Sequence, residues 1–172
     1  MEPVKDKPTV TSDWSPLGTR IAGAVIKHIP PVEDERGEIC EMFREAWGVH
    51  PDPLVYVYMV TIRPGKVKGW VRHLKQDDRI FLIRGTIRIG LYDDRADSPT
   101  HRLLNLFTLS ERNRALVVFP RGVYHAIQNI GESEAVFVNM PTRPYDHADP
   151  DKVRLPLRNP LIPFSFDDGL GW

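Results

Sequence analysis

The sequence predicts an all-β protein, and three observations support this prediction. Short runs rich in β-branched, aromatic and other apolar residues follow one another along the chain. Gly, Pro, Asn or Asp separates almost every pair of runs. Helical character is limited to two segments, 44–49 and 149–153, which have the pattern of short helical turns. This spacing is typical of a β-sandwich or β-barrel.

Each run is expected to form a strand with one buried face. In the run that starts at Thr86, for example, Ile87, Ile89 and Leu91 fall on the same side of an extended chain. That side is expected to face the core, and the other side to face water or a partner. The expected strands are 24–29, 38–43, 54–62, 79–84, 86–92, 103–109, 115–119, 123–129 and 135–140.

Composition indicates one domain with a core of its own. The chain has 172 residues, of which 41% are hydrophobic, and this length is sufficient for one real core without disulfide or metal support. Its 16 prolines concentrate toward the two ends, which predicts extended terminal arms. We therefore expect an N-terminal arm at 1–20, a single domain at 21–166 and a tail at 167–172.

Charge and hydropathy argue against two classes of partner. The 23 basic and 23 acidic side chains balance, and no basic cluster indicates nucleic-acid binding. No apolar stretch approaches the roughly 20 residues of a membrane span. The polar segment from Met1 to Lys7 lacks the apolar core of a signal peptide, so a cytoplasmic protein is expected.

Two segments carry the most specific pattern. The segment from Pro120 to Asn129 resembles the second motif of the cupin superfamily, Pro-x-Gly-x-x-His-x-x-x-Asn, at every fixed position, including His125. The segment from Gly65 to Gly85 is similar to the first motif. It has His73 and Asp78 in frame, but Val71 stands where the motif has its first His.

Within the cupins, residues 21–166 resemble the dTDP-4-dehydrorhamnose 3,5-epimerase family. The similar segments are Asp34-Glu35-Arg36-Gly37, Lys68-Gly69-Trp70, 93–100, 141–145 and 159–166. The resemblance implies a cupin jelly-roll barrel (a double-stranded β-helix), usually a homodimer, with a nucleoside-diphosphate sugar in the barrel mouth and no cofactor. It also implies substrate contacts from Arg36, Glu41, Lys68, Arg79, Tyr145, Asn139 and Asn159.

The positions that match the family's catalytic residues are changed. Val71, Asn139 and Asn159 stand where the family has its base, its acid and the carboxylate partner of the base. We therefore expect altered chemistry on a 4-keto-deoxysugar nucleotide, either epimerisation or isomerisation. His73 and His125 are the candidate catalytic residues, because an imidazole is a suitable base near neutral pH. Asp77, Asp78 and Asp146 are alternative partners for His73.

Two other functions use the same residues. His73, Asp78 and His125 would supply two imidazoles and a carboxylate, a ligand set found in metal-dependent cupin enzymes. We expect no metal in the site, because Val71 removes one of the usual ligands. The combined loss of base, acid and base partner also fits a member that binds a sugar nucleotide without catalysis.

Overall fold

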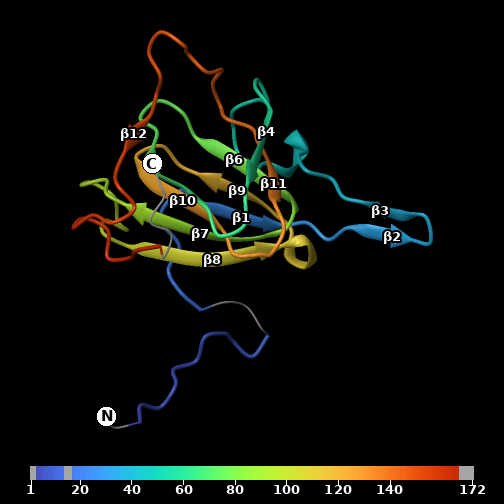
Figure 1. Cartoon of the computed structure of the whole chain (residues 1–172), viewed down its shortest axis with the longest axis horizontal. Helices are drawn as coiled ribbons and strands as arrows, with labels where there is room; N and C mark the ends of the chain where they lie inside the picture. Colours follow the sequence, from blue (N-terminus) through green and yellow to red (C-terminus); the bar gives the residue numbers. More distant parts are fainter. Residues whose placement is uncertain (1–2, 14–16, 167–172) are drawn as a thin grey trace.

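The computed structural model describes residues 3–13 and 17–166 and consists of two antiparallel sheets packed as a sandwich (Figure 1). The all-β prediction is confirmed. The first sheet has the order β1 (Val25–His28), β9 (Ala115–Phe119), β6 (Asp78–Arg84), β11 (Ala135–Asn139) and β4 (Tyr58–Ile62). The second has the order β12 (Val153–Arg154), β5 (Val67–Arg72), β10 (Val123–Asn129), β7 (Thr86–Asp93) and β8 (Leu104–Ser110).

The main core lies between the sheets and follows the alternation read from the sequence. Ile87, Ile89 and Leu91 of β7 are buried together, as expected. They meet Leu82 of β6 and Val117 of β9 from the opposite sheet. Burying a large aliphatic side chain is worth about 1.5–3 kcal/mol, so these inward positions supply most of the force that holds the two layers together.

A short hairpin projects from one edge of the sandwich (Figure 1). It comprises β2 (Val32–Asp34) and β3 (Gly37–Ile39). The strand expected at 38–43 is therefore wrong beyond Ile39. The chain instead covers the outer face of the first sheet with Cys40, Phe43 and Trp47, and apolar burial there replaces strand pairing.

The helical turn expected at 44–49 is present as a 3-10 turn, η1 (Glu45–Trp47). A second 3-10 turn, η2, is formed by Glu111–Asn113.

The strand expected at 54–62 begins only at Tyr58. The chain that precedes residue 54 is held outside the sheet, because the Arg79 guanidinium donates to the carbonyls of Asp52 and Pro53, at 2.7 and 2.9 Å.

The helical turn expected at 149–153 is also wrong. The Asp151 carboxylate accepts hydrogen bonds from the backbone N–H groups of Leu74 and Lys75, at 2.9 and 2.7 Å, which holds this segment against the end of β5. Val153 and Arg154 then pair with β5 as the short strand β12. Beyond β12 the chain returns over the second sheet, where Phe166 packs on Trp70.

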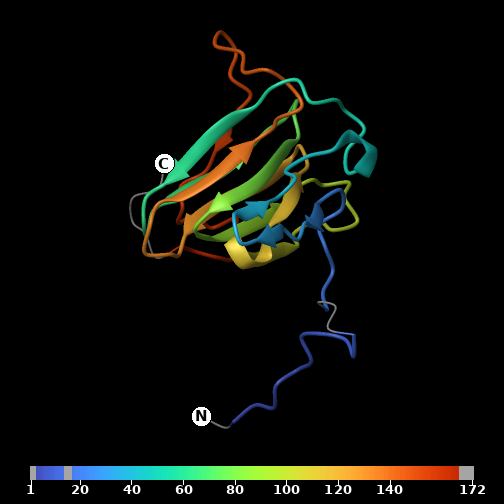
Figure 2. The ribbon, with the colours of Figure 1, turned by 90° about the vertical axis from the view of Figure 1, so that its right-hand side faces the viewer.

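The described part of the N-terminal arm leads away from the sandwich (Figures 1 and 2). Residues 3–13 and 17–20 are exposed. The predicted tail at 167–172 lies outside the described residues. Within the described ranges, no helix is long and apolar enough to span a bilayer.

Candidate active site

A cavity of about 270 Å³ opens between the two sheets. It adjoins a larger cavity of about 570 Å³, and both are lined by Tyr58, His73 and Lys152. The larger cavity is bordered by the segment between β11 and β12, which includes Tyr145. In Figure 1 this segment rises beyond the ends of the strands. The arrangement offers a small inner chamber and a wider outer one, with three side chains shared between them.

The inner cavity contains a cluster of two histidines and one carboxylate. The Nε2 atoms of His73 and His125 lie 3.3 and 3.7 Å from Oδ2 of Asp78. The Nε2–H of Gln76 donates to Oδ1 of Asp78 at 2.9 Å, and the Nδ1–H of His73 donates to the Asp151 carbonyl. Of the three carboxylates that the sequence left open as partners of His73, the structure brings Asp78 to it.

Strand alternation explains how this cluster enters the barrel. On β6, Asp78 lies on the same side as Ile80 and faces the cavity. On β10, His125 and Ile127 both line the cavity, in agreement with the predicted face. His73 follows directly after β5 and lines the same cavity as Val71.

The surroundings shift the pKa values of the three groups in different directions. Burial lowers the pKa of His73, but its bonds to Asp78 and to the Asp151 carbonyl outweigh burial and leave the pKa raised. Burial alone would raise the pKa of Asp78, but His73 outweighs it and the pKa is lowered. Burial lowers the pKa of His125 to about 4, against the opposite effect of Asp78. His73 has an acceptor at each ring nitrogen, the Asp151 carbonyl at Nδ1 and Asp78 at Nε2, which favours its imidazolium form, whereas burial favours the neutral form of His125.

Three cationic side chains also line the inner cavity. Lys68 comes from β5, Lys152 from the residue before β12, and Arg154 from β12. Burial and then the charge of Arg154 lower the pKa of Lys152, while Asp78 opposes them. A cluster of this kind favours an anionic ligand or an oxygen that gains negative charge.

A phenol and an amide form the wall contributed by the first sheet. Tyr58 of β4 is the register partner of Asn139 of β11, and the Nδ2–H of Asn139 donates to the Tyr58 hydroxyl oxygen at 2.8 Å. Both side chains line the cavity. The Oδ1 of Asn139 is buried, and no described residue is hydrogen-bonded to it. An unpaired buried acceptor costs about 1–3 kcal/mol, which points to a ligand that supplies a donor.

The predicted site residues divide into two groups. His73, His125, Lys68 and Asn139 line the inner cavity, and Tyr145 lines the outer one. The structure does not bring the other predicted contacts to either cavity.

The four predicted contact residues that line neither cavity have other partners. Arg36 pairs with Asp34 on the hairpin, and Glu41 pairs with Arg44. Asn159 closes a turn with the Pro156 carbonyl at 2.9 Å. Arg79 follows Asp78 along β6 and therefore points out of the barrel, where it donates to the Met140 carbonyl at 2.8 Å.

Three polar side chains of the inner cavity were not predicted from the sequence: Tyr58, Lys152 and Arg154. The alternation of Tyr56 and Tyr58 was a usable signal, because two aromatics on one side of a strand mark a face. No such signal existed for Lys152 and Arg154. They reach the cavity only because a two-residue strand pairs with β5 at the far end of a long connection.

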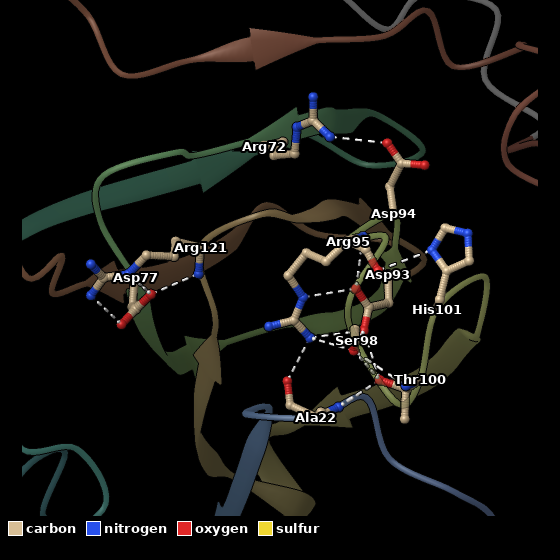
Figure 3. A network of polar contacts seen from close by, with 10 residues as sticks. All are labelled: Ala22, Arg72, Asp77, Asp93, Asp94, Arg95, Ser98, Thr100, His101 and Arg121. Atoms are coloured by element: carbon tan, nitrogen blue, oxygen red, sulfur yellow. Dashed lines mark hydrogen bonds and ion pairs between the residues drawn. The ribbon is translucent and has the colours of Figure 1, made fainter.

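Two other buried carboxylates close polar networks outside this cavity (Figure 3). Oδ1 of Asp77 accepts from the backbone N–H and the Nε–H of Arg121, at 2.6 and 3.0 Å. His50 lies 2.9 Å from Oδ2 of the same carboxylate. Asp93 accepts from Arg95, Ser98 and Thr100, at 2.8, 2.6 and 2.6 Å.

These two networks are structural. The Asp93 network also reaches the N-terminal segment, because Arg95 donates to the Ala22 carbonyl at 2.7 Å. Its partners hold the pKa of Asp93 well below the ordinary value, against the effect of burial.

The ligand atoms of His73, Asp78 and His125 lie within 4.8 Å of one another, so the three could hold a metal ion. The fit is incomplete, since Val71 offers no donor and the positive charge of His73 already compensates Asp78. The same three side chains could take part in proton transfer without a metal ion.

Comparison with known proteins identifies the family of the chain. A family model described as dTDP-4-dehydrorhamnose 3,5-epimerase matches residues 18–160. The probable low-salt glycan biosynthesis epimerase Agl13 of Haloferax volcanii is 39% identical over 125 residues, which is 72% of this chain and 80% of that protein.

Solved structures show the same fold. A dTDP sugar isomerase from Desulfovibrio desulfuricans has a TM-score of 0.77 at 27% identity, covering 85% of this chain and 92% of that one. A variant of ChmJ, a 3'-monoepimerase from Streptomyces bikiniensis in complex with dTDP, has a TM-score of 0.74 at 24% identity, covering 90% and 81%. With the family match over most of its length, the chain belongs to the dTDP-4-dehydrorhamnose 3,5-epimerase family.

Proposed function

We propose that the protein binds a nucleoside-diphosphate 4-keto-deoxysugar and moves the proton on a carbon next to the ketone. The observation that carries this proposal is the buried cluster of His73, Asp78 and His125 at the floor of a cation-lined cavity. The sugar and its diphosphate occupy the inner cavity, and the nucleoside occupies the outer one beside Tyr145. Relatives that act on or bind dTDP-sugars support the ligand class.

The residues have separate roles in this reaction. His125, a neutral imidazole, accepts the proton from the carbon next to the ketone, and the electron pair moves to the ketone oxygen as an enolate. Asp78 stabilises the imidazolium that forms on His125. His73 acts through Asp78, because its positive charge keeps that carboxylate ionised. Lys152 stabilises the enolate oxygen, since a preorganised cation in a site shielded from water lowers the energy of developing charge.

The altered positions fit a relocated site. Val71 lines the cavity without chemistry of its own, while its register partner on β10, His125, lies 3.7 Å from Asp78. The cations Lys68 and Arg154 support a diphosphate, because charge-assisted hydrogen bonds are stronger where water is limited.

The test is proton exchange in deuterated water, followed by NMR. We expect the protein to introduce deuterium next to the ketone of dTDP-4-keto-6-deoxyglucose or its UDP counterpart, and His125→Asn to reduce the rate about 100-fold or more. Exchange that persists unchanged in His125→Asn would contradict the assigned base. Absence of exchange with both probes, together with a thermal shift on adding dTDP, would favour the non-catalytic binding function.

We further propose that the protein is a homodimer whose N-terminal third reaches the partner. Val32 and Ile39 face each other across the β2–β3 hairpin and are 76% and 77% exposed. Met59 on the edge strand β4 is 65% exposed. Exposed edges and apolar hairpins favour pairing with another chain. Arg36 and Glu41, which are far from this chain's own cavities, would then lie near those of the partner.

A mass measurement in solution tests the dimer. We expect about twice the 19.7 kDa of one chain at micromolar concentration. The double variant V32D/I39D should shift the population toward the monomer, because opposed carboxylates repel across the hairpin. A wild-type protein that is only monomeric at this concentration would exclude the proposal.

A further inference from the structure

We infer that Tyr58 is the second proton-transfer group of the site and returns the proton on the face opposite His125. The inference rests on the proposed function and extends it from proton removal to inversion of configuration. Inversion needs a donor on each side of the sugar, and the His73–Asp78–His125 cluster provides only one side.

The placement of Tyr58 comes from the order of the strands. In the first sheet, β11 separates β4 from β6, so Tyr58 and the strand that carries Asp78 are two interstrand spacings apart, or about 10 Å. Tyr58, Asn139 and Ile80 form one cross-strand row that lines the cavity. The separation leaves room for one sugar ring between the phenol and the histidine cluster.

Asn139 holds the phenol in place and leaves its proton available. The amide N–H of Asn139 donates to the Tyr58 oxygen at 2.8 Å, so that oxygen accepts from within the wall. No described residue accepts a hydrogen bond from the Tyr58 hydroxyl. A donor fixed on the phenol oxygen also stabilises the phenolate that remains after the proton leaves.

Burial and the charge of Asp78 raise the pKa of Tyr58 to about 12, with Asn139 acting in the opposite direction. The phenol therefore carries its proton at neutral pH. The unpaired Oδ1 of Asn139 is the second sign of a ligand at this wall, because it can accept a hydroxyl of the bound sugar.

The proton balance of the reaction is complete. His125 takes the proton from one face of the carbon, and the C–H electron pair becomes the enolate. The Tyr58 O–H bond then breaks, its proton forms the new C–H bond on the other face, and the enolate returns to the ketone. The phenolate regains a proton from water, and the His125 imidazolium loses one to water.

The experiment measures exchange and inversion separately on one sample. The probes are dTDP-4-keto-6-deoxyglucose and its UDP counterpart in deuterated water, with deuterium content and configuration read by NMR. In Tyr58→Phe we expect inversion to fall at least 100-fold while exchange stays within about threefold, because His125 can still remove the proton and return deuterium to the same face. In His125→Asn both should be lost.

Two further variants separate chemistry from packing. Asn139→Leu should lower inversion relative to exchange in the same direction by a smaller factor, because the phenol loses its positioning donor. Tyr124→Phe removes a phenol that neighbours His125 in sequence but packs against Arg72 on the other face of β10. We expect this control to leave both rates unchanged.

Three results would overturn the inference. Inversion by Tyr58→Phe at the wild-type rate would exclude Tyr58 as the donor. Equal loss of exchange and inversion would show that Tyr58 serves the first proton transfer or the shape of the cavity. A wild-type protein that exchanges neither probe would remove the proposed function itself, and this result is recognised from the wild type alone.

Discussion

Asp77 and Asp78 are consecutive residues whose carboxylates have opposite surroundings. Asp77 is bound by Arg121 and His50 outside the inner cavity. Asp78 faces into the barrel, where His73 and Gln76 bind it and His125 lies 3.7 Å away. Asp78 is the first residue of β6, whereas Asp77 lies just before the strand. The Asp77 carboxylate joins loops together, while the Asp78 carboxylate acts to raise the pKa values of two imidazoles in the cavity.

The two regions differ in whether their buried polar groups have hydrogen-bond partners within the protein. The Asp77 and Asp93 networks are closed by protein donors, so they have stability as their role. The wall of the inner cavity retains one buried acceptor, Oδ1 of Asn139, that no described residue satisfies. A buried polar group without a partner is costly, and function is the usual reason for tolerating it. The contrast predicts that changes at the first two carboxylates alter stability and changes at Asp78 alter activity.

The largest expected effect is on catalysis. Asp78→Asn should reduce the deuterium exchange rate about 1,000-fold, because the imidazolium formed on His125 loses its counter-charge. Asp77→Asn, its immediate neighbour, should keep the rate within about fivefold. Exchange rates on 4-keto-sugar nucleotides measure both. Similar losses in the two variants would show that the contrast between the carboxylates is false.

The second effect is on stability at the Asp93 network. Arg95→Leu leaves the fully buried Asp93 carboxylate without its cationic partner, and breaking a buried pair costs about 3–5 kcal/mol. For a chain of this length the melting temperature should fall by about 6–20 °C. Calorimetry measures this change. Arg95→Lys, which keeps the charge, should recover part of the loss, and exchange activity measured well below the melting temperature should be retained.

The sequence predicted most strands of the sandwich, though not β5 or β12, and the inward position of His125, because these depend on local alternation. It could not select Asp78 over Asp77 or Asp146, since that choice depends on where β6 begins. It also missed Tyr58 as the neighbour of Asn139, because the register between β4 and β11 joins residues 81 positions apart. Arg79 was expected at the substrate, but it follows Asp78 on the strand and therefore faces the other way.

A smaller effect should follow pH at Asp77. Burial would raise its pKa, but the bonds from Arg121 and His50 outweigh burial and lower the pKa to about 2. A lowered pKa gives stability that is complete above pH 4 and is lost as the pH falls toward 2. After allowance for the half-exposed Arg121, Asp77→Asn should cost about 1–2 kcal/mol at pH 7.

Urea unfolding of the wild type and Asp77→Asn between pH 7 and pH 3 measures this dependence. The gap between the two proteins should narrow only below pH 4. A gap that stays constant to pH 3 would mean that Asp77 contributes by its shape rather than by its charge.

The smallest effect is expected from metal removal. Val71 provides no ligand, and Asp78 is already compensated by the positive charge of His73, so a metal ion would have to displace an existing ion pair. We expect less than about 0.1 equivalents of iron, manganese or zinc per chain by elemental analysis, and a chelator should leave both the melting temperature and the exchange rate unchanged. The variant Val71→His is the matched comparison, because it restores a donor beside His73 and His125. Stoichiometric metal in the wild type that disappears in His125→Ala would instead establish a metal-dependent site, and the assignment of His125 as a free base would then fail.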